Sequence, residues 1–198
     1  MNNITQLKEF LSLYKAFDDV EEAERKALLQ FLDAFGEFTY DRANLVGHLS
    51  VSAWIVNKER NKVLMIYHNM FKTWAWVGGH ADKDTNLLEV AIKEIQEETS
   101  VTKLRPLSPY PVDINMMVVH NHYKNDTFVP RHLHPNIVYA FEADENEKLK
   151  IKPDENSGVM WIKCEDVEKY CTNDKVMPYY ERIMQKIKKC IDENKKII

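Results

Sequence analysis

The sequence lacks any apolar run near the roughly 20 residues that a membrane-spanning helix requires. Its longest candidates are short, strand-like pieces such as residues 51–56. The first 17 residues are interrupted by Lys8 and Lys15, unlike the continuous apolar segment of a signal peptide. An excess of positive charge is also missing, because 27 Lys and Arg stand against 31 Asp and Glu. No chain-wide basic field is available for a nucleic-acid backbone, so we expect a soluble, cytoplasmic protein with neither a membrane nor a nucleic-acid polymer as partner.

Cysteine is scarce as well. Cys164, Cys171 and Cys190 are odd in number, lie far apart and match no paired zinc spacing. No neighbouring histidine or helix start that would activate a thiol accompanies them. These cysteines are therefore interpreted as reduced thiols that pack or lie at the surface.

Helical spacing of apolar residues recurs in three parts of the chain. Residues 4–35 predict a pair of helices, the second beginning near Asp18 and Asp19. Thr85 to Thr99 predict an amphipathic helix, and residues 177–191 predict a last helix, for which Pro178 suits the first turn.

Runs rich in β-branched and aromatic residues lie between the helices and predict strands. These runs are residues 48–56, 62–68, 74–77, 113–119, 136–141 and 159–163. The 198 residues contain no repeat, low-complexity run or Gly/Ser linker. We therefore expect an α/β (α+β) fold, an α/β/α sandwich with a mixed sheet at 46–198 and an N-terminal helical extension at 1–45.

The predicted helix at 85–99 has an unusual acidic face. Leu88, Ala91, Ile92 and Ile95 form the apolar stripe that docks it on a core. Another face holds Glu94, Glu97 and Glu98, whose like charges repel one another by a few tenths of a kcal/mol at these spacings. A hard divalent cation such as Mg²⁺ compensates this repulsion, because it prefers oxygen ligands.

A solvated acidic face is the commonest reason for such a cluster. The residues upstream favour a ligand site instead. Gly78 and Gly79 allow close approach of the backbone to a ligand, and an acidic loop leads from them into the helix.

Residues 79–101, GHADKDTNLLEVAIKEIQEETSV, resemble the signature of the Nudix hydrolases, G-x5-E-x7-R-E-U-x-E-E-x-G-U, in which U is a bulky aliphatic residue. The alignment is ungapped. Its matched positions are Gly79, Glu94, Ile95, Glu97, Glu98 and Val101. The preceding segment, from Trp74 to Asp82, resembles the W-x-x-P-G-G-H-x-D lead-in of one bacterial branch of that family.

Three positions depart from the family signature. Thr85 replaces its first glutamate, Lys93 its arginine and Ser100 its helix-ending glycine. Lysine cannot reproduce the two-pronged hold of arginine on a carboxylate, so Lys93 is expected to position Glu97 or Glu98 less firmly. Thr85 is expected to cap the helix together with Asp84. Ser100 is expected to adopt the conformation that glycine relieves.

The resemblance implies a Nudix-type pyrophosphohydrolase that splits a diphosphate linkage in a nucleoside-diphosphate-type small molecule. Its metal would be Mg²⁺, with Mn²⁺ as a substitute, bound by Glu94, Glu97 and Glu98. The expected catalytic set is Glu94, Glu97, Glu98, Lys93 and Glu155, with Glu94 and Glu155 as alternative general bases. The expected substrate contacts are Gly78, Gly79, His80 and Trp74.

Other interpretations stay open. Glu155 is at least as well explained as a surface loop residue. The departures from the signature favour a catalytically weak, nucleotide-binding or regulatory protein of the same fold, and an interaction module with a merely acidic helix is a third alternative. The N-terminal helices are a candidate homodimer surface.

Histidines and aromatic residues suggest further sites. His120 with His122, and His132 with His134, would each share a face of an extended segment, which is compatible with a metal site or with phosphate binding. Trp74, Trp76 and Tyr67 are candidates for stacking on a base, although aromatic residues in strands more often pack in the core.

Overall fold

The computed structural model describes residues 3–124 and 126–192, which fall into two compact units. Unit 1 takes in Met1–Val51, Gly79–Val90 and Ile114–Ile137. Unit 2 takes in Ser52–Gly78, Ala91–Asp113 and Val138–Ile198. The chain passes between the units inside one helix and several strands, so single elements contribute residues to both.

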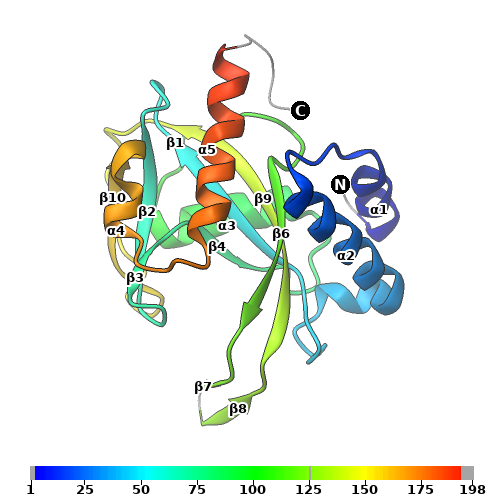
Figure 1. Ribbon diagram of the computed structural model, residues 1–198. Coiled ribbons are helices and arrows are strands. Elements are labelled where there is room, and N and C mark those ends of the chain that lie inside the picture. Colours follow the sequence, from blue (N-terminus) through cyan, green and yellow to red (C-terminus); the bar gives the residue numbers. More distant parts are fainter. Residues whose placement is uncertain (1–2, 125, 193–198) are drawn as a thin grey trace. The chain divides into compact units, whose positions relative to one another are not determined.

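Unit 1 begins with two helices that pack against one another, α1 (Ile4–Leu13) and α2 (Asp19–Phe35), followed by the 3-10 helix η1 (Gly36–Tyr40) (Figure 1). As the sequence predicts, α2 begins next to an aspartate: the side chain of Asp18 accepts the backbone N–H of Glu21. Leu7, Leu11 and Leu28 are buried between the helices and their surroundings. Their apolar faces therefore explain the association of the pair.

The strands of unit 1 come from two segments of the chain. β6 (Asp113–Val119) pairs with β9 (His132–Ala143), and between them the hairpin β7 (His122–Lys124) and β8 (Thr127–Val129) extends the ribbon (Figure 1). A parallel bridge joins Gly47 to Leu133, and the backbone N–H of His48 donates to the carbonyl of Leu133. This pairing fixes the chain just before β1 (Ser50–Val56) beside the start of β9.

Unit 2 contains the sheet with strand order β10-β2-β1-β9-β5. β2 (Lys62–His68) pairs antiparallel with β1, with β3 (Thr73–Ala75) and with β10 (Asn156–Lys163), and β5 (Leu104–Pro106) pairs antiparallel with β9. β4 (Val77–His80) pairs with β1. The central strands are buried almost throughout, as sheets covered on both faces require.

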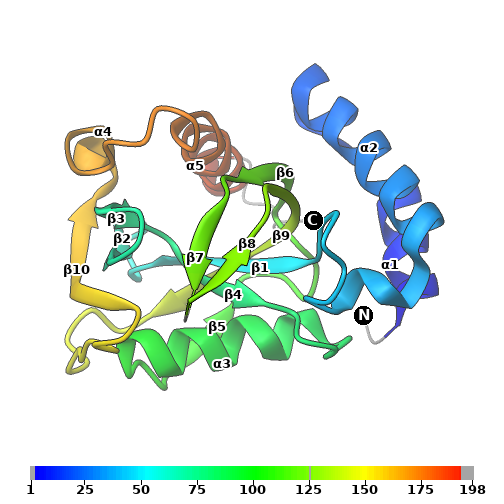
Figure 2. The ribbon, with the colours of Figure 1, turned by 90° about the horizontal axis from the view of Figure 1, so that it is seen from below.

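Helices cover both faces of this sheet. Figure 2 shows α5 (Met177–Asp192) on one side of the strands and α3 (Leu87–Thr99) on the other, the latter contributing residues 91–99 to unit 2. The 3-10 helix η2 (Cys164–Asp166) and the short α4 (Val167–Tyr170) connect β10 to α5. A buried ion pair ties α5 to the start of β6, since Arg182 binds Asp113 through two hydrogen bonds of 2.7 and 2.8 Å. The predicted α/β/α arrangement is confirmed.

The structure corrects several predicted boundaries. Gly78 and Gly79 lie inside strand β4, beyond the end of the strand predicted at 74–77, which the structure divides between β3 and β4. The predicted helix at 85–99 begins two residues later, at Leu87. The strand predicted at 136–141 is longer and begins at His132, because the bridge to Gly47 extends its pairing. β5, β7 and β8, with three residues each, are too short for a hydrophobic period to reveal.

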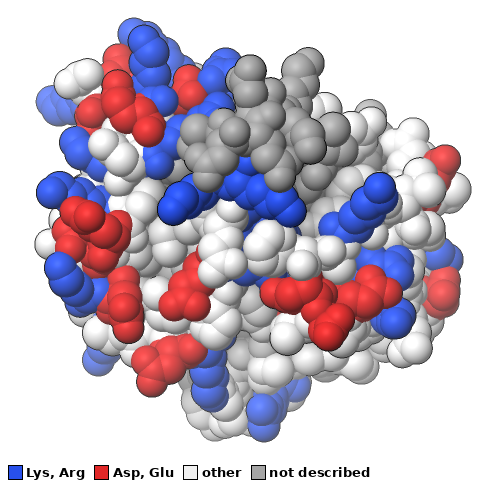
Figure 3. All heavy atoms as spheres, turned by 45° about the horizontal axis from the view of Figure 1, so that its top comes forward, with Lys and Arg blue, Asp and Glu red and all other residues white. Residues whose placement is uncertain are grey.

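The surface carries charge of both signs. On the face drawn in Figure 3, Lys and Arg side chains are interspersed with Asp and Glu side chains. Among the described residues, no helix combines the length and the apolar character needed to cross a bilayer.

Candidate active site

The carboxylates of the candidate site lie on the part of α3 that belongs to unit 2. Ala91 and Ile95 are fully buried there and anchor the helix, whereas Ile92 is only half-buried. Glu98 continues the buried face, with 2% of its surface exposed. The sequence analysis placed Glu98 on a separate polar face, and this prediction is wrong: Glu98 lies on the side of the helix that packs against the core.

Glu98 is held by strand β4. The backbone N–H of Gly78 donates a hydrogen bond of 3.1 Å to Oε2 of Glu98. The side-chain amide of Asn156, at the start of β10, donates 3.1 Å to the backbone carbonyl of Glu98. The pKa of Glu98 is raised to about 8, mainly by burial. The hydrogen bond from Gly78 opposes this rise, and the neighbouring carboxylates of Glu94 and Glu155 add to it.

The other two carboxylates of α3 differ in environment. Burial raises the pKa of the half-buried Glu94, and the negative charge of Glu155 acts in the same direction. The hydrogen bond from Lys152 lowers the pKa of the exposed Glu97. The three carboxylates therefore include one group that stays charged and two that hold a proton more readily, which is a pattern typical of functional sites.

Lys152 is the basic residue that the sequence analysis missed. Its Nζ lies 2.9 Å from Oε2 of Glu97 and 3.1 Å from Oε2 of Glu155. Burial alone would lower the pKa of Lys152, but the bonds to Glu97 and Glu155 have the larger combined effect and raise this pKa. No motif spacing indicates this contact, because Lys152 and Glu97 are 55 residues apart in the chain.

Lys93, the residue at the arginine position of the signature, has a weaker contact. Its Nζ is 3.8 Å from Oε1 of Glu97, and 72% of its side chain is exposed. Exposed pairs of this kind contribute little. The structure thus agrees with the expectation that Lys93 positions Glu97 loosely, and it supplies a closer cation in Lys152.

The predicted aromatic residues separate into two groups. Trp76 is 8% exposed and its backbone N–H donates to the hydroxyl of Tyr180, so it belongs to the core. Trp74 is half-buried and meets the ring of Tyr67 edge to face at 5.7 Å. A Cβ at Gly158 would lie 3.0 Å from the Trp74 ring, so this glycine makes room for the indole. Trp74 and Tyr67 are both half-buried and are the aromatic side chains of the set that keep exposed surface.

The remaining departures from the signature are resolved in part. The residue before α3 is Asn86, whose carbonyl accepts the backbone N–H of Val90, so Thr85 does not occupy the capping position. The side chain of Asp84 accepts the backbone N–H of Asn86 at 2.8 Å, just before the helix begins. Ser100 has a φ of +63°, which confirms that it adopts the left-handed conformation usually reserved for glycine.

The predicted residues Gly79 and His80 belong to unit 1, where His80 joins a group of histidines. The two strand positions His132 and His134 share a face as predicted, and their Nε2 atoms are 2.9 Å apart. The ring of His122 lies 6.5 Å from that of His132. His48, which the sequence analysis did not single out, stacks on His132 at 4.8 Å. The structure therefore groups His132 and His134 with His48 and His80, a combination that the sequence spacing does not indicate.

The structure thus defines an α/β protein with a carboxylate-bearing helix held by a Gly-Gly strand. A family model described as the NUDIX domain matches residues 46–185, and the chain belongs to that family. The fold is therefore the Nudix α/β fold with its mixed sheet, preceded by helices within residues 4–40.

Solved structures agree on the fold. A C. elegans Ap4A hydrolase in a binary complex matches with a TM-score of 0.51 and 15% identity, over 73% of this chain and 98% of the other. A NUDIX-family hydrolase from Clostridium perfringens gives 0.51 and 18%, over 71% and 97%. A MutT protein from Methanosarcina mazei gives 0.51 and 20%, over 72% and 96%. Comparison with curated proteins gives no significant match.

Proposed function

We propose that this protein is a Mg²⁺-dependent pyrophosphohydrolase that splits a diphosphate linkage in a nucleoside-diphosphate-type small molecule, with Mn²⁺ as a substitute metal. One observation carries the proposal: Glu98 is a buried carboxylate whose Oε2 is fixed by the backbone of Gly78, one helical turn from Glu94 and beside Glu97. Membership of the NUDIX domain family supports the same reaction class.

The residues present fit a hard divalent cation. All three side chains offer oxygen ligands, which Mg²⁺ prefers. Among the described residues, no lysine, arginine or histidine forms an ion pair with Glu98, although its carboxylate is buried. A buried charge without a counter-charge is costly. Ligation of a cation by Glu94, Glu97 and Glu98 would remove this cost.

Each residue has a separate role in the proposed reaction. A bound Mg²⁺ would supply neutralisation of the diphosphate charge and polarisation of phosphorus. Glu97 and Glu98 would hold the ion, and the Gly78 backbone keeps Glu98 in one orientation. Lys152 keeps Glu97 charged and oriented, and Lys93 assists it from the solvent side.

Glu94 is the favoured general base. It is half-buried and its pKa is raised, and a base whose pKa lies closer to the working pH accepts a proton from water more effectively. It takes the proton of a water that attacks phosphorus in line, opposite the leaving group. Glu155, the alternative base, is occupied by its ion pair with Lys152.

Substrate contacts are proposed in the segment that precedes the carboxylates in the sequence. In unit 2, the partly exposed Trp74 offers a ring for stacking and Gly78 offers backbone close to Glu98. Gly79 and His80 follow directly in β4 and stay predicted contacts on their sequence position. Four other features likewise stay predictions from the sequence. They are membership of one bacterial branch of the family, a domain boundary after residue 45, a cytoplasmic location and a homodimer formed through the N-terminal helices.

The test is a phosphate-release screen with Mg²⁺ or Mn²⁺ over nucleoside triphosphates, dinucleoside polyphosphates, nucleotide sugars and dinucleotide cofactors. We expect turnover of at least one class, abolished in Glu97→Gln and in Glu98→Gln while circular dichroism shows an unchanged fold. Glu89→Gln is the matched control, because Glu89 is an exposed carboxylate on the same helix. Activity that survives both site substitutions would refute the proposal.

A second candidate is a nucleotide-binding protein of this fold without turnover. The exposed position of Lys93, 3.8 Å from Glu97, favours it, because the arginine hold of the signature is absent. Inactivity on every substrate class, combined with Mg²⁺-dependent binding of a nucleotide in calorimetry, would establish this candidate instead.

A further inference from the structure

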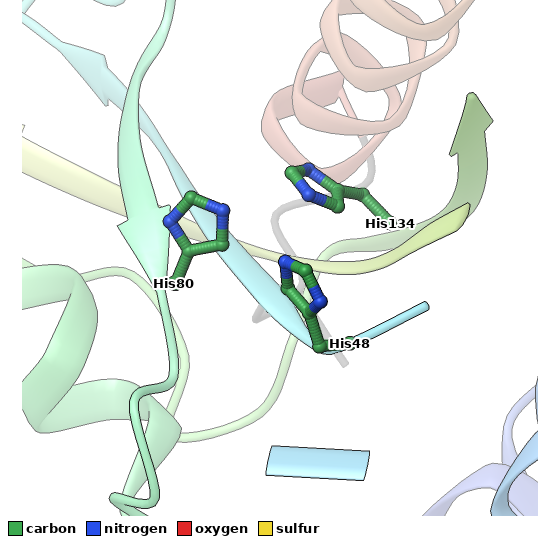
Figure 4. Close-up of side chains that lie close together, drawn as sticks. All are labelled: His48, His80 and His134. Carbon is green, nitrogen blue, oxygen red and sulfur yellow. The ribbon is translucent and has the colours of Figure 1, made fainter. Parts of the chain in front are cut away.

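Unit 1 contains a compact cluster of imidazole rings from three separate segments. His48 precedes β1, His80 ends β4, and His132 and His134 lie at the start of β9. The ring of His48 lies 5.1 Å from that of His80 and 4.9 Å from that of His134, and the rings of His80 and His134 are 4.9 Å apart. Figure 4 shows His48, His80 and His134 converging on one point.

Backbone carbonyls orient two of these rings. Nδ1 of His48 lies 3.2 Å from the carbonyl oxygen of Asn44, and Nδ1 of His132 lies 2.8 Å from that of Pro130. A carbonyl only accepts hydrogen bonds, so in each neutral ring Nδ1 donates and Nε2 keeps its lone pair. This arrangement is the one that proteins use to orient histidine ligands of metals.

The same argument extends to His134. Its Nε2 lies 2.9 Å from Nε2 of His132, which can only accept in this tautomer. Nε2 of His134 is therefore the donor, and its Nδ1 keeps the lone pair. His132 thus acts as a positioning residue, and His48, His80 and His134 remain as three nitrogen ligands.

We propose that His48, His80 and His134 bind one divalent transition-metal ion of the Zn²⁺ class, with His132 holding His134 in its ligating tautomer. The ligand atoms of the three histidines all lie within 4.8 Å of one another. Around a tetrahedral Zn²⁺, with Zn–N distances of about 2.0 to 2.1 Å, neighbouring nitrogens are about 3.3 Å apart. Side-chain rotations that bring the ligand nitrogens closer to one another by roughly 1.5 Å would reach this spacing.

The chemistry of the ligands decides which ion they take. Imidazole nitrogen suits Zn²⁺, Co²⁺, Ni²⁺ and Cu²⁺, whereas Mg²⁺ prefers oxygen. Asp82, a carboxylate that interacts electrostatically with His48 and His80, is bound by the guanidinium of Arg42. Three histidines leave one coordination position for water or an anion, as in catalytic zinc sites.

The test uses Co²⁺ and Zn²⁺ alone as probes, on the full chain without a histidine tag. Both ions also bind carboxylates, so the titrations are made in a Glu94→Gln/Glu97→Gln/Glu98→Gln background as well as in the unsubstituted protein. We expect one Co²⁺ per chain in that background, with the visible absorption of a low-coordinate cobalt site, displaced by Zn²⁺. This design separates the histidine site from the proposed hydrolase function, because the carboxylates that would bind Mg²⁺ are replaced in that background.

Substitutions then assign the ligands. His80→Ala, at a half-buried position, and His134→Ala are each expected to weaken Co²⁺ binding at least tenfold, and His132→Ala to weaken it about tenfold. His68→Ala is the matched control, because His68 is a histidine of unit 2 that packs on Phe71. Thermal melts identify any variant that fails to fold. The inference is overturned if the triple-Gln background binds no Co²⁺, or if folded His80→Ala and His134→Ala proteins bind it as the control does.

Discussion

The backbone N–H of Gly78 and Oε2 of Glu98 are joined by a hydrogen bond of 3.1 Å. Strand β4 therefore fixes the orientation of an acid that follows it by 20 residues and sits on the buried side of α3. Gly78 has a specific role here, because its backbone contacts helix α3 directly and holds Glu98 in one orientation.

Burial of Glu98 makes metal-free stability depend on pH. Its pKa is raised from 4.5 to about 8 on folding, so the folded protein binds a proton that the unfolded chain releases. The stabilisation is complete below about pH 4.5 and is lost as the pH rises through about 8. We expect urea denaturation in a chelator to show stability falling over this window.

Glu98→Gln is expected to remove most of that pH dependence, because glutamine stays neutral throughout. Glu89→Gln, on the exposed side of the same helix, is expected to keep it. Parallel pH profiles for the unsubstituted protein and Glu98→Gln would contradict the assignment of the shift to this carboxyl.

Mg²⁺ is expected to stabilise the folded protein. A ligand that binds only the native state raises the protein's free energy of unfolding by about 2.7 kcal/mol when the ligand concentration is a hundred times Kd. Differential scanning fluorimetry with millimolar Mg²⁺ or Mn²⁺ measures this directly. The increase in Tm should vanish in Glu94→Gln/Glu97→Gln/Glu98→Gln. An interaction module with a merely acidic helix would show no increase at all.

Lys152 is expected to matter more for activity than Lys93. Lys152→Ala removes the 2.9 Å bond to Glu97, and loss of ligand positioning typically costs roughly 10 to 100-fold in turnover or metal affinity. Lys93→Ala removes a contact of 3.8 Å from an exposed side chain and should change activity less than about threefold. Steady-state kinetics of the two variants test this prediction. Equal losses of activity would show that Lys93, at the arginine position of the signature, positions Glu97 as much as Lys152 does.

Ser100→Gly is expected to stabilise the protein. Ser100 has a φ of +63°, a conformation that costs a residue with a side chain about 1 to 2 kcal/mol and glycine nothing. Glycine also has greater entropy in the unfolded chain, which offsets part of this stabilisation. The expected net increase in the free energy of unfolding is roughly 0.5 to 1 kcal/mol. Ser157→Gly, at a position of β10 without a positive φ, is the control and should destabilise. Chemical denaturation of both variants tests the difference, and a loss of stability in Ser100→Gly would show that the left-handed backbone is not strained.

Local pattern predicted the long elements well. β2 and β6 have the predicted bounds, and α2 and α5 begin where Asp18 and Pro178 indicate, because alternation, helical spacing and capping are read within one segment. The carboxylates of α3 were equally accessible to sequence reasoning, since all three lie on one helix.

Contacts between distant segments were not accessible. Lys152 reaches Glu97 only because the loop before β10 folds over α3, and His48 meets His134 only through the pairing of Gly47 with Leu133. The burial of Glu98 was missed for the same reason: its side of the helix is set by the strand that packs against it, which helical spacing does not reveal.

The most direct test of the central claim is the anomalous scattering of Mn²⁺ in a crystal of the protein. The account predicts a manganese peak bound by carboxylate oxygens of Glu97 and Glu98, with Glu94 beside it and the Gly78 to Glu98 hydrogen bond in place. Glutamates turned apart with no peak between them, at a Mn²⁺ concentration that supports turnover, would contradict it.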